Sequence, residues 1–289
     1  MNSLYSRKVS EEYFRWQFFD SPHDVGLILL EVDGQVAGCL GTHIIPLKTD
    51  EKIAWYIDIA IVKDHQGQGH FNQLHDAVQD FARSKSADAL GVMGNPNAHA
   101  VLTEKMGWQS VRAIDTWELD FQQASGETIR IRTEFAFNYP WYTPDGSLFA
   151  DRSSKWLNRR FFRNPRYRYS GIDLSSEDNQ TARIIFKEFV DPLSGKKTID
   201  IVEFLCTAEK QSTIKSLLVR ALQSISNGEP ITFATWLETG TTFDSVAKDL
   251  GFKPLNKPRF FDVKPLNENG KRLLDSNAWH LTMQDAEVY

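Results

Sequence analysis

Hydrophobic and polar residues alternate between positions 53 and 62. The odd positions are large and apolar, and the even positions are smaller or polar. The odd set is Ile53, Trp55, Ile57, Ile59 and Ile61, and the even set is Ala54, Tyr56, Asp58, Ala60 and Val62. This pattern predicts a strand with one face in the core and the other turned toward a cleft. Apolar residues then recur at helical spacing from Phe71 to Ala82, which predicts a helix after a short turn.

The same order of features recurs about 144 residues later, which predicts an internal repeat. Residues 16–22 (WQFFDSP) align with 159–165 (RRFFRNP), 74–78 (LHDAV) with 218–222 (LVRAL), and 105–108 (KMGW) with 249–252 (DLGF). Amphipathic helices that end in glycine and an aromatic residue are common, so chance likeness is the alternative.

We therefore expect an α/β (mixed α+β) protein made of two tandem units, each a mixed β-sheet flanked by helices. The first unit is expected over residues 1–122, a connector over 123–150 and the second unit over 151–289. In the connector, residues 127–137 alternate like a strand, and 138–140 and 144–146 carry turn signals.

Two glycines stand between the predicted strand and helix of the first unit, in the segment Gln66-Gly67-Gln68-Gly69-His70-Phe71. Glycine allows positive φ and close approach of the backbone, so successive N–H groups can converge on an anion. A helix that begins there adds unpaired donors and the positive end of its dipole. A plain tight turn is the alternative, because the segment matches neither a P-loop nor the three-glycine dinucleotide fingerprint.

The order of elements resembles the GNAT superfamily of acyl-CoA-dependent N-acyltransferases. Its signature is a strand, an Arg/Gln-x-x-Gly-x-Gly/Ala loop with a helix, a second strand, an Asn-containing turn, and a helix closed by Gly-Phe or Gly-Trp. Gln66 and Gly69 match the loop, and Gly107-Trp108 match the stop. Phe71 departs from the usual Gly or Ala. With the Asn95-Pro96-Asn97 turn, it is similar to a subgroup among sugar and polysaccharide biosynthesis acyltransferases.

The resemblance implies a site for acetyl-CoA or another acyl-CoA as co-substrate, without a metal. The backbone amides of the loop would hold the pyrophosphate, and the strand end at Ile61 and Val62 would part from its neighbour and pair with the pantetheine arm. The implied cofactor-binding residues are Ile61, Val62, Gln66, Gly67, Gln68, Gly69, His70, Phe71 and Asn97.

Acyl transfer from a thioester needs a neutral amine and an exit for its proton. By resemblance, Asp58 on the strand before the loop is the candidate base, and holding a loop or a sugar hydroxyl is the other reading of it. The usual Tyr acid is replaced by Thr103, a poor donor, which leaves His99 and Tyr56 as substitutes or as structural residues. Asn97 is assigned as helix N-cap, with contact to pantetheine or acceptor as a second, catalytic reading.

The second unit lacks the glycines, because Lys210, Gln211, Ser212 and Thr213 align with the loop. Ser212 or Thr213 is expected to cap a helix that carries apolar residues from Ile214 to Leu222. We expect a degenerate copy that does not bind CoA and that completes the acceptor cleft and stabilises the first unit. Among residues 155–169, five arginines alternate with aromatic residues; we expect a buried aromatic face and solvated arginines, with a nucleotide or RNA contact as the alternative.

Composition restricts the partners. The 289 residues include 33 Lys and Arg against 38 Asp and Glu, and this net charge of -5 gives no general attraction to nucleic acid or anionic membrane. No apolar stretch approaches the ~20 residues of a membrane helix. The polar start resembles no secretion signal, so we expect a cytoplasmic protein. The two cysteines, Cys39 and Cys206, are expected to be buried thiols.

The resemblance to GNAT proteins thus implies an enzyme, an N-acyltransferase that moves an acetyl or other short acyl group from acyl-CoA to a small-molecule amine. An amino sugar or sugar nucleotide is the acceptor suggested by the subgroup, and no membrane or nucleic-acid partner is expected. A non-catalytic CoA-binding or interaction module with a vestigial site is one alternative. A peptidyl-transfer enzyme that uses aminoacyl-tRNA is another, which the glycine loop disfavours.

Overall fold

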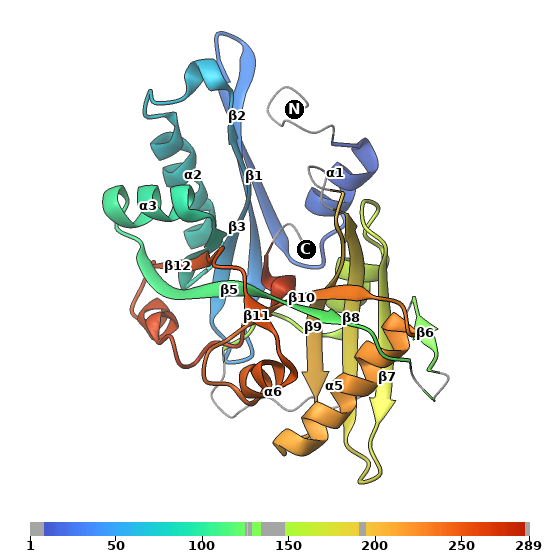
Figure 1. The fold of residues 1–289 in the computed structure, drawn as a ribbon. Helices are drawn as coiled ribbons and strands as arrows, with labels where there is room; N and C mark the ends of the chain where they lie inside the picture. The colour runs from blue at the N-terminus through green and yellow to red at the C-terminus, as the bar shows by residue number, and fades with distance from the viewer. Residues whose placement is uncertain (1–8, 125, 127–128, 134–147, 191–194, 287–289) are drawn as a thin grey trace. The chain divides into compact units, whose positions relative to one another are not determined.

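The computed structural model describes residues 9–124, 126, 129–133, 148–190 and 195–286 (Figure 1). Its chain forms two compact units. The first comprises residues 1–113, 146–152 and 259–279, and the second comprises residues 114–145, 153–258 and 280–289. The turn signals predicted at 138–140 and 144–146 lie outside the described residues. Because each unit has a mixed sheet with helices, the predicted mixed α+β class is confirmed.

The sheet of the first unit has the strand order β1-β2-β3-β4-β12. Only β3 and β4 are parallel, and the other neighbours are antiparallel. The strands are β1 (Asp24–Val32), β2 (Gln35–Pro46), β3 (Lys52–Ile61), β4 (Ala89–Gly94) and β12 (Arg259–Pro265). The helical elements are α1 (Glu11–Phe18), η1 (Lys63–His65), α2 (His70–Ser84), α3 (Pro96–Lys105) and η3 (Asn269–Leu274).

The second unit repeats this order as β7-β8-β9-β10-β5, with β6 beside β7 and β11 beside β5. Here β9 and β10 are the parallel pair. The strands are β5 (Gln109–Phe121), β6 (Ile131–Arg132), β7 (Tyr169–Ser175), β8 (Thr181–Val190), β9 (Lys197–Cys206), β10 (Ile231–Leu237) and β11 (Lys253–Pro254). The helical elements are α4 (Ser154–Leu157), the π-helical turn η2 (Asn158–Phe162), α5 (Gln211–Ser226), α6 (Thr242–Leu250) and η4 (Met283–Asp285).

Each unit takes its fifth strand from the other half of the sequence. β12, near the end of the chain, pairs with β4, whereas β5, which directly follows α3, pairs with β10. The compact units therefore differ from the ranges 1–122 and 151–289 by an exchange of strands. The division of the sequence into units 1–122 and 151–289, based on the internal repeat, stays a prediction.

Amphipathic helices cover the sheets as their periodicity predicts. α2 lies against the first sheet (Figure 1). Its Leu74, Val78 and Ala82 are buried with Leu40 and Leu90. The predicted apolar face of α5 packs in the same way on the second sheet. It consists of Ile214, Leu217, Leu218, Ala221 and Leu222, all buried.

Both Gly-aromatic stops end a helix. Gly107 (φ +71°) follows α3 and Gly251 (φ +97°) follows α6, in the left-handed region that ends a helix without strain for glycine. Trp108 and Phe252 are buried beside them. Neither cysteine forms a disulfide within the described residues, and both thiols are buried, as predicted.

The arginines between residues 155 and 169 divide into two groups. Arg163, Arg166 and Arg168 are exposed, in line with a solvated face. Arg159 and Arg160 are buried, so that expectation is wrong for them. Arg160 donates to the backbone carbonyls of Gln284 and Ala286. The C-terminal segment therefore supplies hydrogen-bond acceptors for the Arg160 guanidinium. Sequence spacing could not predict this contact, because the two segments are far apart along the chain.

Candidate active site

The parallel strands β3 and β4 pair over only three residues. Ile53, Ala54 and Trp55 lie opposite Ala89, Leu90 and Gly91. Beyond that point β3 continues to Ile61 and β4 to Gly94, outside this register. A strand edge released in this way can pair with an extended ligand through its backbone.

Two backbone groups at the end of β3, where pantetheine is predicted to pair, already form hydrogen bonds within the chain. The Val62 N–H donates to the carbonyl of Ala37 at 2.8 Å, and the Gln66 side chain donates to the carbonyl of Ile61 at 2.8 Å. The parting of the strands starts earlier, after Trp55. Pairing of pantetheine with Ile61 and Val62 stays a prediction.

Asp58 lies at a bulge in β3. The register between β2 and β3 shifts between Cys39 and Gly41, and Asp58 adopts φ +48°. Its carbonyl accepts from the Cys39 thiol at 3.4 Å, and the residue is only 7% exposed. A bulge inserts a residue and redirects the side chains after it. Asp58 is therefore a buried carboxylate beside the parted strand edge.

The bulge also breaks the alternation that the sequence predicts. Ile59 is 38% exposed, so the prediction that it lies in the core is wrong. The even positions do not face an open cleft either, because Ala54 and Tyr56 are buried under α2. On the other face, Trp55 stacks on Phe261 with ring centroids 5.2 Å apart. Helix α2 therefore covers one face of β3, and Phe261 of β12 lies against the other.

The glycine loop forms an open turn between η1 and α2. Gly67 and Gly69 have φ +75° and +83°, and a Cβ at either would meet nothing within 4 Å. Gly69 is the N-cap of α2, and the first turn of the helix carries no acidic residue. The Asn72 N–H donates to the carbonyl of Gly69 at 3.0 Å. The N–H groups before it in the turn have no carbonyl four residues back within the helix, and they lie at the positive end of the helix dipole. This arrangement fits a diphosphate.

Side chains near the loop brace its backbone. Gln68 donates to the carbonyl of Asp64 at 2.8 Å, which with the bond from Gln66 ties the loop to η1 and β3. His70 Nδ1 is buried without a hydrogen-bond partner among the described residues. Phe71, the departure from the GNAT pattern, packs against the core cluster under α2, 6.3 Å from the His75 ring.

Asn95, in the turn after β4, is the N-cap of α3. Its side chain accepts from the Ala98 N–H at 2.9 Å, and Pro96 opens α3. The assignment of Asn97 as N-cap is therefore wrong; proline favours the first helical position, which makes the preceding residue the cap. Asn97 is exposed in the first turn of α3. Its contact with a ligand is untested.

Tyr56 belongs to a buried network that links three elements. Its hydroxyl lies 2.8 Å from His75 Nδ1 on α2, and His75 Nε2 lies 3.2 Å from Lys264 Nζ on β12. Burial, then the nearby Asp76 charge, raise the pKa of Tyr56. Burial and Lys264 lower the pKa of His75 to about 4, against the opposing effect of Asp76. A tyrosine held this way is a poor proton donor.

His99, one helical turn before Thr103, is paired with a buried carboxylate. His99 Nδ1 lies 2.9 and 3.0 Å from the two carboxylate oxygens of Asp262 on β12. The ring of Phe260 stacks on the imidazole at 4.1 Å. Asp262 is fully buried, and burial raises its pKa, opposed by hydrogen bonds from His99 and Ser110. Sequence reasoning named His99 but missed Asp262, which is 163 residues away.

Thr103, at the position where the family places a tyrosine, is held by its own helix. Its hydroxyl donates to the carbonyl of His99 at 2.8 Å, the i−4 bond common for threonine within helices. The hydroxyl is therefore turned along α3. Thr103 is not placed to protonate a leaving group.

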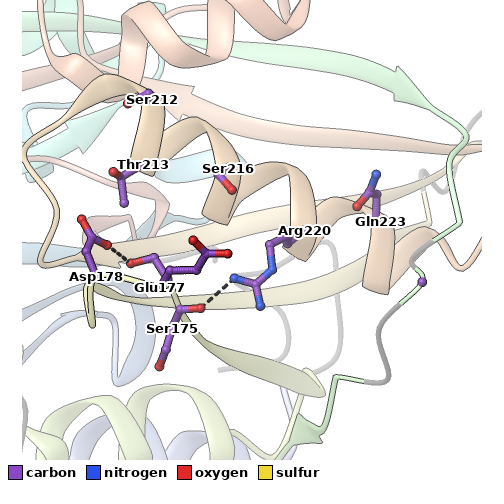
Figure 2. Close-up of a pocket in the computed structure, with 10 residues that line it drawn as sticks. Ser175, Glu177, Asp178, Ser212, Thr213, Ser216, Arg220 and Gln223 are labelled. Atoms are coloured by element: carbon purple, nitrogen blue, oxygen red, sulfur yellow. Dashed lines mark hydrogen bonds between the residues drawn. The ribbon is translucent and has the colours of Figure 1, made fainter.

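The corresponding region of the second unit lacks the open turn. Lys210 is the N-cap of α5 and makes no side-chain cap bond, so the prediction that Ser212 or Thr213 caps this helix is wrong. Both residues line a polar hollow of about 910 Å³ between α5 and the β7–β8 turn (Figure 2). Arg220 also lines it and donates to the carbonyl of Ser175 at 2.7 Å. Glu177 and Asp178 add negative charge, which does not suit a diphosphate.

The parting of strands is nevertheless repeated in the second unit. β9 and β10 pair only over Thr198–Asp200 and Thr232–Ala234. A cavity of about 60 Å³ lies beyond and is lined by both strands and by residues 280–282. There His280 Nδ1 lies 3.5 Å from Glu238 Oε2, and Thr282 donates to Glu203 at 3.2 Å. No sequence signal pointed to these contacts of the C-terminal segment.

Comparison with known proteins supports the GNAT fold. Residues 2–108 match the model of the acetyltransferase (GNAT) family. This segment contains the glycine loop, the parted strands and α3, and the chain as a whole has the GNAT fold in tandem. No curated protein sequence matches the chain at a significant level.

Solved structures with the same fold share little sequence with this chain. A probable N-acyltransferase from Enterococcus faecalis is 10% identical with a TM-score of 0.65, over 92% of this chain and 68% of its own. A tandem GNAT protein from the clavulanic acid biosynthesis pathway is 14% identical with a TM-score of 0.55, over 91% and 90%. A GCN5-related N-acetyltransferase from Anabaena variabilis is 11% identical with a TM-score of 0.56, over 83% of this chain and 63% of its own length.

Within the described residues, no helix is long and apolar enough to cross a membrane. No group of three or more His, Cys, Asp or Glu side chains in the same residues is arranged to bind a metal ion.

Proposed function

We propose that the chain is an acyl-CoA-dependent N-acyltransferase of the GNAT type, whose first unit transfers an acetyl or other short acyl group to the amine of a small molecule. The observation that carries the proposal is the glycine loop at the start of α2, directly after the strand that parts from β4. The loop suits the CoA diphosphate, and the strand edge suits the extended pantetheine arm. The match of residues 2–108 to the GNAT family model supports the assignment.

In this proposal the chain holds the acyl donor with backbone groups. The N–H groups from Gln66 to Phe71 bind the diphosphate, and no side chain of the loop need carry charge. CoA supplies the thioester. Asp58 accepts the proton from the attacking amine, and Asn97 contacts the pantetheine arm or the acceptor. An amino sugar, free or nucleotide-linked, is the acceptor to test first, on the resemblance of Phe71 and the Asn-Pro-Asn turn to the sugar subgroup.

The second unit is proposed to bind no CoA. The N-terminus of α5 carries side chains where the first unit has glycine, and Glu177 and Asp178 line the adjacent hollow (Figure 2). Cβ atoms obstruct the close approach of a diphosphate to the backbone, and the two carboxylates repel it.

The proposal is tested by replacing Gly69 with valine. Acetyl-CoA is expected to raise the Tm of the parent chain by an amount that grows with its concentration. Gly69→Val is expected to weaken binding at least about tenfold, because a β-branched residue at φ +83° must distort the turn. Calorimetry and thermal shift measure both effects.

Gly34→Val is the matched control. Gly34 has φ +77° and open space around it, but lies in the β1–β2 turn. The control pays the same backbone strain and is expected to keep the acetyl-CoA shift. A parent chain that binds no acyl-CoA, or a Gly69→Val variant that binds as the parent does, would contradict the proposal. Thiol release with a library of amines then identifies the acceptor.

A further inference from the structure

The pair formed by His99 and Asp262 has the geometry of a proton-transfer group. The imidazole donates from Nδ1 to a carboxylate that is fully buried, and this fixes the tautomer and the orientation of the ring. The stacked Phe260 restricts its rotation. The His99 side chain is 24% exposed, so the imidazole is not sealed in the core.

The pair lies beside the segment of β4 that follows its last pairing with β3. Asp262 is opposite Val92, and Phe260 is opposite Gly94, both beyond the last pairing with β3. The backbone at Gly94 packs closely on α3, since a Cβ there would lie 3.4 Å from that of Ala98. The start of α3, and with it His99, is thereby fixed against the parted segment.

His99 provides the polar partner that this buried carboxylate requires. A buried carboxylate is costly without a hydrogen-bond donor, and the Nδ1–H group of His99 is that donor. Among the described residues, Asp262 is the titratable group in contact with His99. The hydroxyls of Thr103 and Tyr56 are engaged elsewhere, Thr103 with its own helix and Tyr56 with His75.

We propose that His99, positioned by Asp262, gives the proton that the sulfur takes up when the acyl group is transferred; this rests on the function proposed above. The amine nitrogen bonds to the thioester carbon, the carbon–sulfur bond breaks, and the electron pair stays on sulfur. His99 delivers the proton from Nε2, and the free thiol of CoA leaves. The imidazole keeps its Nδ1–H bond to Asp262 and regains a proton from solvent.

The test uses the full chain with the amine acceptor identified by thiol release. His99→Gln is expected to lower kcat about 10²-fold while KM for acetyl-CoA stays within about twofold, the size typical of a lost general acid. Asp262→Asn is expected to lower kcat with KM for acetyl-CoA again within about twofold, because the imidazole loses the carboxylate that orients it. Thr103→Val is the matched control on the same helix and is expected to keep both parameters.

A second readout does not depend on turnover. In the chain labelled with ¹⁵N-histidine, the NMR shifts of the two His99 ring nitrogens are expected to show a hydrogen-bonded Nδ1–H in the parent chain and in Thr103→Val, and to change in Asp262→Asn. Unchanged shifts in Asp262→Asn, or a His99→Gln variant with parental kcat, overturn the role of the pair while the proposed function stands. A parent chain that neither binds acetyl-CoA nor releases thiol overturns the proposed function, and this role with it.

Discussion

At the scale of single residues, the site depends on backbone conformations that side chains rarely adopt. Asp58 has φ +48° at the bulge of β3, and Gly67 and Gly69 have positive φ in the loop that follows. A non-glycine residue in the left-handed region carries strain that the surrounding structure must compensate. At Asp58 the bulge compensates it and sets a carboxylate at a strand edge released from its neighbour.

Asp58→Asn tests the carboxylate at this bulge. The variant is expected to lower kcat about 10²-fold or more, because the amide cannot accept a proton, and to leave the affinity for acetyl-CoA within about twofold. Steady-state kinetics and calorimetry separate the two quantities. Asp64→Asn, the same change at an exposed residue of η1, is the control. Equal kcat in Asp58→Asn and the parent would remove Asp58 from the base role.

At the scale of elements, β3, α2 and β12 are tied together by Tyr56, His75 and Lys264. His75 is 2% exposed and its neighbour Lys264 is a cation, so the folded chain holds the imidazole neutral. Its pKa is about 4 in the fold, against 6.5 as the ordinary value. Between these values the unfolded chain binds a proton that the folded chain does not. Stability from this residue is therefore present above pH 6.5 and is lost as the pH falls toward 4.

A pH series measures this loss. From pH 7 to pH 4.5 the parent chain is expected to lose about 2 to 3 kcal/mol of its free energy of unfolding through His75, beyond what other groups contribute. His75→Gln keeps hydrogen-bonding groups without a proton to gain, so its decline is expected to be smaller by that amount. Urea denaturation of both proteins at each pH gives the difference. Parallel pH curves would show that His75 does not titrate as its surroundings indicate.

At the scale of the whole molecule, the two halves of the sequence exchange their fifth strands. β12 brings Phe261, Asp262 and Val263 into the first sheet, all fully buried. The same strand supplies Lys264 to the network with His75. The segment 1–122 therefore contains the glycine loop but neither the edge partner of β4 nor the partner of His99.

Truncation tests this exchange. The fragment 1–122 alone is expected to bind acetyl-CoA at least about tenfold more weakly than the full chain, because it leaves the edge of β4 unpaired. Co-expression with the fragment 123–289, which contains β12, is expected to restore binding. Circular dichroism and calorimetry report folding and affinity. Full affinity in the fragment 1–122 alone would show that the first unit does not need β12.

Local patterns along the chain were enough to predict the features that depend on a few neighbouring residues. Helical spacing gave α2 and α5, glycine conformation gave the loop and the helix stops, and the resemblance to GNAT proteins came from the order of these local signals. Tertiary structure alone decided the bulge at Asp58, the exchange of β5 and β12, and the pairing of His99 with Asp262. These depend on strand partners that are distant along the chain, and local periodicity carries no information about which distant strand completes a sheet.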